Sequence, residues 1–191
     1  MKKVLIIGAS GSLAQYVIEA LKGLNNVSLT LFVRSKNRLS KGISEGNTII
    51  EGDAMNYNDV KNAVDGQDIV HVNLAGNLEA MATNIVKAMQ EKGIKRIIAI
   101  SSIGIYESPL KPVLIPYRKL ADIIESSDLE YTILRPDWFT NANEISYSIT
   151  HKGEPEKGSA ISRKSIASFI STLIENPELH KNENLGISKP N

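Results

Sequence analysis

The residues best suited to chemistry form a glycine-rich run near the start of the chain, Gly8-Ala9-Ser10-Gly11-Ser12-Leu13-Ala14, directly after the apolar stretch Val4–Ile7. A turn between a buried strand and a helix aims free backbone N–H groups and the positive helix end at an anion. Gly8 permits the tight turn, Gly11 lets phosphates approach, and Ala14 allows close helix–strand packing. The run predicts a dinucleotide site, with a purely steric glycine turn as the alternative. The expected phosphate contacts are Gly8, Ser10, Gly11, Ser12 and Leu13.

The second apolar stretch, Val27–Val33, ends in Arg34-Ser35. Dinucleotide sites that prefer NAD usually carry a carboxylate there, which binds the ribose hydroxyls. A guanidinium binds a 2′-phosphate through a forked pair of hydrogen bonds, whereas a carboxylate repels it. Arg34, assisted by Ser35 and Arg38, therefore predicts NADP as the cofactor. NAD is the other possible cofactor, and a solvated basic loop is the alternative to a phosphate site.

The glycine-rich run and Arg34 must be held in place by the surrounding fold. Short apolar runs alternate with amphipathic segments along the chain, and this alternation is typical of a parallel sheet covered by helices. The runs that predict strands are Val4–Ile7, Val27–Val33, Thr48–Ile50, Ile69–Leu74, Arg96–Ile100 and Tyr131–Leu134. Helical spacing appears from Leu13 to Leu24, over Asn58–Val64, from Met81 to Met89 and around Leu120–Ile124. We expect an α/β fold, a Rossmann-type doubly wound parallel sheet in a three-layer αβα single domain over residues 1–191.

Beyond Pro136 the composition is more polar and the strand–helix rhythm weakens. We expect residues 137–191 to contribute the substrate side of the same domain. Within them, Ser162 is suited to cap a helix that ends near Glu175. Trp138 and Phe139 follow the last predicted strand, where aromatic rings can stack on a planar substrate; packing in the core is the alternative.

Composition argues against several classes of function. The 22 Lys and Arg residues balance 21 Asp and Glu, so the net charge of +1 lacks the basic field that nucleic acids require. The chain has no Cys, and His71, His151 and His180 are scattered, so we expect no metal site. No apolar stretch approaches the roughly 18 to 20 residues that cross a bilayer. We expect a cytoplasmic monomer or homodimer with a small-molecule substrate or protein partner, and no nucleic-acid or membrane partner.

A resemblance to a known family extends over nearly the whole chain. The segments that carry it are Gly8-Ala9-Ser10-Gly11, Val33-Arg34, Glu51-Gly52-Asp53, Leu74-Ala75-Gly76, Ile100-Ser101-Ser102-Ile103-Gly104, Tyr131-Thr132-Ile133-Leu134-Arg135-Pro136 and Ile161-Ser162-Arg163. The sequence resembles an atypical short-chain dehydrogenase/reductase of the NAD(P)H-binding, NmrA-like group, which includes biliverdin and flavin reductases. The cofactor contacts implied by the resemblance are Asp53 and Ala54 at the adenine edge, Asn73, Leu74, Ala75 and Gly76 along the adenosine ribose and phosphates, and Ser101 and Ser102 toward the nicotinamide. Pro136, at the end of the last predicted strand, completes the expected cofactor-binding set.

Short-chain dehydrogenases place a tyrosine four residues before a lysine, so that the ammonium lowers the pKa of the phenol and aids proton exchange. Tyr117-Arg118-Lys119 lacks this spacing, and the tyrosine position falls on Ile115 if Lys119 is the family lysine. Two residues along a helix correspond to a rotation of about 200°, so Tyr117 and Lys119 are expected to point to opposite sides. The catalytic candidates are Tyr117, Ser102 and Lys119, whose ammonium can also bind the cofactor ribose; the substrate-pocket candidates are Tyr106, Trp138 and Phe139. The alternatives are an exposed helix lysine for Lys119 and packed or loop residues for Ser102 and Tyr106.

Three functions fit these residues. The leading hypothesis is an NADPH-dependent oxidoreductase whose small planar acceptor, a quinone, flavin or conjugated carbonyl, takes its proton from solvent. A non-catalytic NADP(H) sensor that changes its affinity for a protein partner is the second. A nucleotide-sugar epimerase or dehydratase ranks last, because it needs the tyrosine.

Of the histidines, His71 is expected to be a hydrogen-bonded sheet residue and His151 to be exposed, with a place at the substrate pocket as its alternative.

Overall fold

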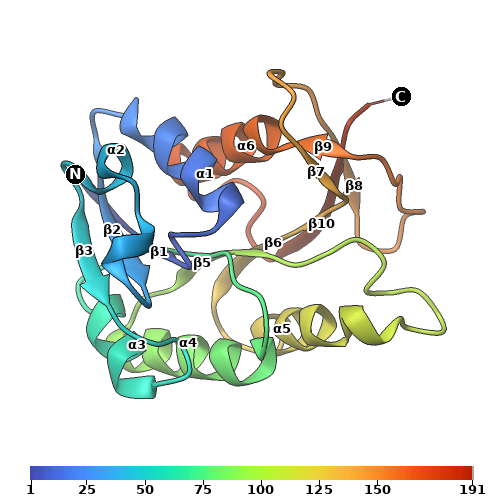
Figure 1. The fold of residues 1–191 in the computed structure, drawn as a ribbon. Helices are drawn as coiled ribbons and strands as arrows, with labels where there is room; N and C mark the ends of the chain where they lie inside the picture. Colours follow the sequence, from blue (N-terminus) through green and yellow to red (C-terminus); the bar gives the residue numbers. More distant parts are fainter. Residues whose placement is uncertain (191) are drawn as a thin grey trace.

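A mixed sheet of eight strands forms the middle layer of the computed structural model, which describes residues 1–190 (Figure 1). Its order is β3-β2-β1-β4-β5-β6-β10-β8, and every neighbouring pair is parallel except β10 and β8. The strands are β1 Lys2–Ile7, β2 Val27–Val33, β3 Thr48–Glu51, β4 Ile69–Val72, β5 Arg96–Ile100, β6 Glu130–Pro136, β8 Ser148–His151 and β10 Glu183–Ser188. A separate pair, β7 Phe139–Thr140 and β9 Ile161–Ser162, is also parallel.

Helices cover both faces of this sheet (Figure 1). One face carries α1 Ser12–Lys22 and α6 Arg163–Glu175, and the other carries α3 Tyr57–Val64, α4 Leu78–Lys92 and α5 Ile115–Glu125. The short elements are η1 Lys36–Arg38, α2 Lys41–Ser44 and η2 Pro112–Leu114. Because side chains alternate along a strand, Val4 and Ile6 of β1 pack under α1 and α6, while Leu5 and Ile7 face the opposite core. The predicted doubly wound, three-layer α/β fold is therefore confirmed.

The predicted strands and helices correspond to observed elements, with small differences at their ends. The fourth strand was expected to reach Leu74 but ends at Val72, because the chain turns away at Asn73 to line the carboxyl edge of the sheet. The helix expected after Ser162 is α6, and Ser162 caps it by accepting a hydrogen bond from the N–H of Ser165.

The pattern after Pro136 does not predict four strands that the structure contains. Two of them, β8 and β10, complete the main sheet, and the other two form the small pair β7–β9. Strand β10 was not predicted because Asn184 and Gly186 interrupt its apolar pattern. Both are needed there: Asn184 is buried because Arg135 donates hydrogen bonds to it, and any side chain at Gly186 would collide with Thr150. Among residues 1–190, no helix has the length and apolar character to span a membrane.

Candidate functional site

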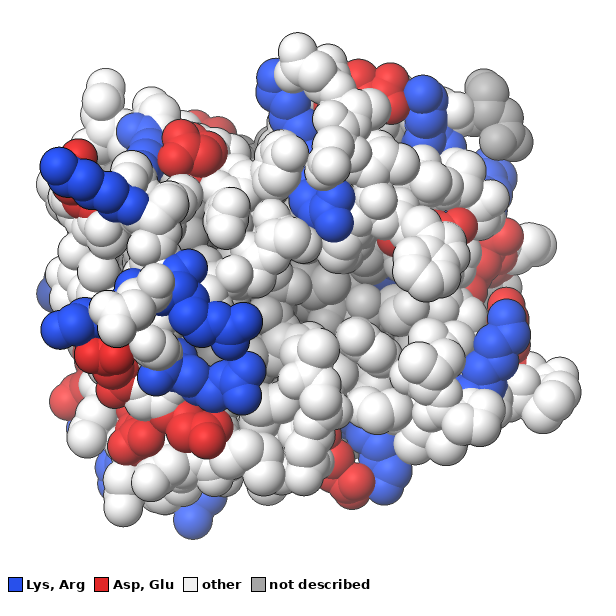
Figure 2. Space-filling view, viewed as in Figure 1, with Lys and Arg blue, Asp and Glu red and all other residues white. Residues whose placement is uncertain are grey.

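The carboxyl ends of the central strands open into a cleft of about 1130 Å³. Strand β1 lies between β2 and β4, so the chain winds outward from it in both directions. Ligands of open α/β sheets bind at such a switch point, outside the carboxyl ends of the strands. Figure 2 shows this face hollowed near its centre, with Lys and Arg side chains gathered on one side of the hollow. The cleft therefore joins the glycine-rich turn to the loops that follow β2, β4, β5 and β6.

The glycine-rich turn forms one wall of the cleft. Gly8 has φ +85°, and a side chain there would collide with the carbonyl oxygen of Asn73. Gly11 precedes α1 as its N-cap, no side chain caps this helix end, and the first turn holds no acidic residue. The first N–H groups of a helix have no partner within it, so those of Ser12 and Leu13 are available to an anion. This arrangement fits the diphosphate of a dinucleotide.

The cleft extends from this turn past the ends of β2 and β3 to the expected adenosine contacts. Arg34, Arg38, Asp53 and Ala54 all line it, whereas Ser35 does not. Neither Arg34 nor Arg38 pairs with a carboxylate anywhere in residues 1–190, so both guanidinium groups remain available to a phosphate. Asp53 Oδ1 instead accepts a hydrogen bond of 2.9 Å from the N–H of Met55. The carboxylate thus organises its own loop at the edge of the cleft.

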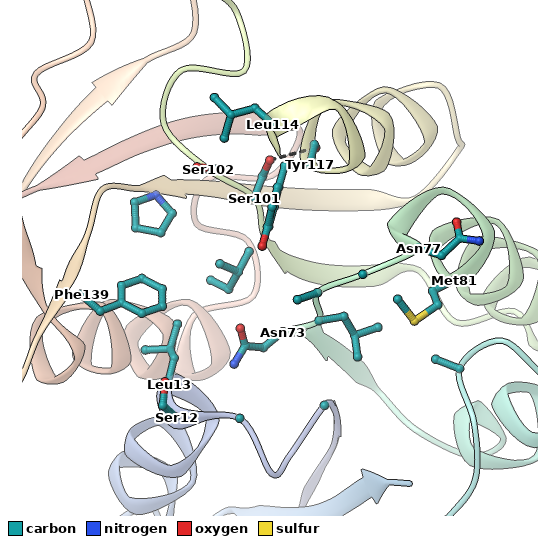
Figure 3. A pocket seen from close by; sticks show the side chains of 18 of the residues that line it. Ser12, Leu13, Asn73, Asn77, Met81, Ser101, Ser102, Leu114, Tyr117 and Phe139 are labelled. Atoms are coloured by element: carbon teal, nitrogen blue, oxygen red, sulfur yellow. Dashed lines mark hydrogen bonds between the residues drawn. The ribbon is translucent and has the colours of Figure 1, made fainter. Parts of the chain in front are cut away.

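At the opposite end, residues from β5, α5 and β6 meet around a space with apolar and aromatic walls, which Glu107, Lys111 and Asp137 also line (Figure 3). Ser101 Oγ donates a 3.0 Å hydrogen bond to the backbone oxygen of Tyr117, which ties the end of β5 to α5. Ser102 Oγ donates to the carbonyl oxygen of Ile103 at 3.1 Å. The Tyr117 side chain lines the cleft, and its hydroxyl makes no hydrogen bond within residues 1–190. A phenol is therefore free to meet a bound molecule here. The expected contacts Leu74, Ala75, Gly76 and Pro136 line the same cleft.

Lys119 lies outside the cleft lining, so the structure favours the alternative of an exposed helix lysine over a contact with the cofactor ribose. Its Nζ forms an ion pair of 2.9 Å with Oε1 of Glu79, in the first turn of α4. The helical rotation between Tyr117 and Lys119 explains the outcome, because a residue that faces the cleft leaves its second neighbour facing away. No ammonium therefore accompanies the Tyr117 phenol in the way that the short-chain dehydrogenase pair requires.

Tyr106 also lies outside the cleft lining, so its expected place in the substrate pocket is not what the structure shows. Its hydroxyl donates to Oε1 of Glu125 at 3.3 Å and accepts from Nδ2 of Asn184 at 2.8 Å. Burial, followed by the charge of Glu125, raises the pKa of the Tyr106 phenol. The side chain is held in a polar network beneath β10 and is a poor proton donor to the cleft.

Phe139 lines the cleft on β7, whereas Trp138 stands at its mouth with 83% of the residue exposed. The alternative of core packing therefore does not hold for Trp138. Lining residues from the β5–α5 loop, such as Ile103, Val113 and Leu114, surround the same end of the cleft. Loop positions of this kind carry no periodic signal, which is why sequence reasoning did not include them.

The two histidines considered from sequence lie away from the cleft lining. His71 is fully buried in β4, its Nδ1 lies 3.1 Å from the carbonyl oxygen of Ile98, and burial lowers its pKa to about 4. His71 is thus a neutral residue of the sheet, as expected. His151 is exposed and borders a separate hollow of about 260 Å³, with its Nδ1 3.8 Å from Glu183.

Comparisons with known proteins agree with this geometry. Residues 8–177 match the model of a family described as NAD(P)H-binding. A Rossmann-fold NAD(P)-binding family protein from Shigella flexneri is 43% identical, with a TM-score of 0.91 over 100% of this chain and 94% of that chain. A short-chain dehydrogenase/reductase from Veillonella parvula DSM 2008, solved in complex with NADP, is 26% identical, with a TM-score of 0.88 over 99% of this chain and 95% of that chain.

A curated relative, the isoflavone reductase homolog A622-like from Nicotiana tabacum, is 28% identical over 153 residues, which are 73% of this chain and 49% of that protein. The chain thus spans about half the length of the curated relatives it matches. The family match covers most of the chain and includes the glycine-rich turn, strands β2 to β9 and α6. The chain belongs to the NAD(P)H-binding family, within the atypical short-chain dehydrogenase/reductase group that its sequence resembles.

Proposed function

We propose that this protein is an NADPH-dependent reductase whose hydride acceptor is a small planar molecule, such as a quinone, flavin or conjugated carbonyl. One observation carries the proposal: the cleft that begins at the glycine-rich turn ends in a space where the rings of Tyr117 and Phe139 form walls beside a few polar and charged groups. Such walls suit a flat ring system, because aromatic side chains bury its faces while a few polar groups orient its edge.

NADP is the proposed cofactor, with NAD as the weaker ligand. Arg34 and Arg38 line the cleft beyond β2, in the position where a 2′-phosphate would extend from the adenosine ribose. A carboxylate at this position would favour unmodified ribose, and the sequence provides Arg34 instead. The Veillonella parvula relative in complex with NADP supports the same choice.

When bound, the reduced nicotinamide supplies a hydride, and the residues of this chain bind, orient and shield the reactants. Ser101 holds α5 against the end of β5, which fixes the Tyr117 ring at the side of the cleft (Figure 3). The ammonium that would support proton transfer from Tyr117 is held by Glu79 instead. Proton delivery therefore falls to water, which the open mouth beside Trp138 admits. Quinones and flavins tolerate this arrangement because their reduced forms take protons readily from solvent.

The deciding experiment is a screen of NADPH oxidation against quinones, flavins, azo dyes and simple aldehydes, with cofactor binding measured in parallel. We expect turnover with quinones or flavins and little with simple aldehydes, which need a positioned acid. A Trp138→Ala variant should raise KM for the accepted substrate more than it lowers kcat. Tight NADPH binding without turnover of any acceptor would overturn the proposal.

The second candidate is a non-catalytic NADP(H) sensor. Trp138, Val113 and Ile115 are apolar residues with exposures of 83%, 71% and 44%, and the first two lie at the cleft, so a partner docked there would contact the bound cofactor directly. Partner affinity that changes between NADP+ and NADPH, in a protein without turnover, would select this function. The epimerase or dehydratase hypothesis is disfavoured because it requires the tyrosine–lysine pair that α5 separates.

A further inference from the structure

Arg163, the first residue of α6, contacts residues of the cleft wall from outside the lining. Its Nε donates a 3.2 Å hydrogen bond to Oγ of Ser12, the residue that begins α1. Its Nη1 donates to Oδ1 of Asn141 at 2.9 Å, and the guanidinium lies 5.2 Å from the ring centre of Phe139. Ser12 and Phe139 both line the cleft, and Figure 3 shows them on the same wall with Leu13. Arg163 itself is not among the residues that line the cleft, but it contacts two that are, Ser12 at the phosphate end and Phe139 at the acceptor end.

The charge of Arg163 is not neutralised within the part of the chain described by the structure. Arg118 and Arg135 pair with Asp122 and Glu156, whereas no carboxylate of residues 1–190 lies within 4.0 Å of the Arg163 guanidinium. Nor does its Nη2 make a hydrogen bond to any of these residues. A guanidinium group with one nitrogen that makes no hydrogen bond can still bind an anion, because it presents several N–H donors in one plane.

The glycine-rich turn itself supplies only neutral donors to a diphosphate. The first turn of α1 contains no charged side chain, and a helix end contributes only about half of a positive charge. Arg34 and Arg38 approach from the other side, at the ends of β2 and η1. Of the cations in the described chain, Arg163 is the one whose side chain is hydrogen-bonded to a residue of the turn. A cation next to this turn would add a charge-assisted hydrogen bond to the neutral donors that face a diphosphate.

We propose that Arg163 is a ligand of the cofactor diphosphate. It binds the diphosphate through Nη2, while Ser12 and Asn141 hold Nε and Nη1 in place. The inference rests on the cofactor site of the proposed function and adds to it a residue from the far end of the chain. It also gives the cation contact with Phe139 a role, since the guanidinium that binds the diphosphate also positions the aromatic wall of the acceptor end.

The test is a calorimetric titration of Arg163→Gln with NADP+, NAD+ and adenosine 2′-monophosphate. The variant should lose about tenfold to a hundredfold in affinity for NADP+ and NAD+ alike, because both carry the diphosphate and a charged hydrogen bond is lost. Affinity for adenosine 2′-monophosphate, which has no diphosphate, should stay within about twofold. Arg34→Gln should give the opposite pattern, weakening NADP+ and adenosine 2′-monophosphate but not NAD+.

Lys164→Gln is the matched control, because Lys164 is the next residue of α6 and its Nζ bonds only Oδ1 of Asn143. It should leave all three affinities unchanged. Unchanged NADP+ affinity in Arg163→Gln would overturn the proposal, as would an equal loss for adenosine 2′-monophosphate, which indicates a disturbed fold. A loss confined to NADP+ would assign Arg163 to the 2′-phosphate and also overturn it. Because every readout is binding, a failed search for an acceptor would not affect the result.

Discussion

Replacing Gly11 with valine should remove cofactor binding while the protein stays folded. Gly11 has φ −70° and ψ 155°, a conformation that a β-branched residue adopts without strain. Its Cβ would lie 3.2 Å from Nδ2 of Asn73 and 3.3 Å from the carbonyl oxygen of Gly8, so the neighbours must shift slightly. Overpacking of this size costs about 1–2 kcal/mol. For a chain of this length the melting temperature should fall by only about 2–8 °C.

The loss of binding should be much larger. The valine methyl groups occupy the space through which phosphates approach the N–H groups of Ser12 and Leu13. Losing two charge-assisted hydrogen bonds, at about 1.5–3 kcal/mol each, weakens binding by at least about a hundredfold. Calorimetric titration with NADP+ measures the loss, and thermal unfolding measures the stability of the variant.

Gly8→Ala provides the comparison, because a methyl group at φ +85° is strained and collides with the backbone of Asn73. It should destabilise the protein more than Gly11→Val does, by roughly 3 kcal/mol or more. If folded Gly11→Val bound NADP+ within threefold of wild type, the glycine-rich turn would not be the diphosphate site. Equal stability of the two variants would show that the positive φ of Gly8 does not require glycine.

Four further substitutions test the cofactor preference, the proton donor, the Lys119 ion pair and the buried histidine. Arg34→Asp should reverse the preference from NADP toward NAD, with about tenfold to a hundredfold loss of NADP+ affinity in a titration; wild-type protein that already prefers NAD+ would contradict this. Tyr117→Phe should leave kcat within a few-fold of wild type, whereas a drop of about a hundredfold at unchanged NADPH affinity would identify Tyr117 as the acid. Lys119→Ala should leave both NADPH affinity and stability nearly unchanged, since an exposed ion pair contributes about 0–1 kcal/mol; calorimetry and urea unfolding check both. His71 stays neutral in the fold, with its pKa lowered to about 4 from 6.5, so the unfolded chain binds the extra proton below pH 6.5. Stability should be full above that pH and fall by about 1.4 kcal/mol per unit between pH 6.5 and 4, and His71→Leu should flatten this slope in urea unfolding.

The sequence predicts the central sheet because buried parallel strands such as β1 and β5 are continuous apolar runs, and the glycine-rich turn has a fixed place after the first of them. Helical geometry alone correctly separates Tyr117 from Lys119. What the sequence does not reveal is the partner of each side chain. Glu79 forms the ion pair with Lys119 although the two are 40 residues apart in the sequence, and no local sequence pattern indicates that pairing.

The same limit applies to the C-terminal part of the chain. Strand β10 is buried although it contains Asn184, because Arg135 on the neighbouring strand satisfies that polar side chain. Arg163 meets Ser12 across 151 residues, so its place at the cleft depends on the packing of α6 against α1. Contacts of this kind follow from topology, which periodicity predicts only in outline.

In the proposed function the cleft brings NADPH to a planar acceptor. The most direct test of this function is anaerobic loss of NADPH absorbance on addition of a soluble quinone or flavin, compared between wild type and Gly11→Val at equal enzyme concentration. We expect multiple turnovers in wild type, a slower reaction when NADH replaces NADPH, and no reaction above background in Gly11→Val. Wild-type protein that binds NADPH yet oxidises none of it with any quinone, flavin or conjugated carbonyl would contradict this function.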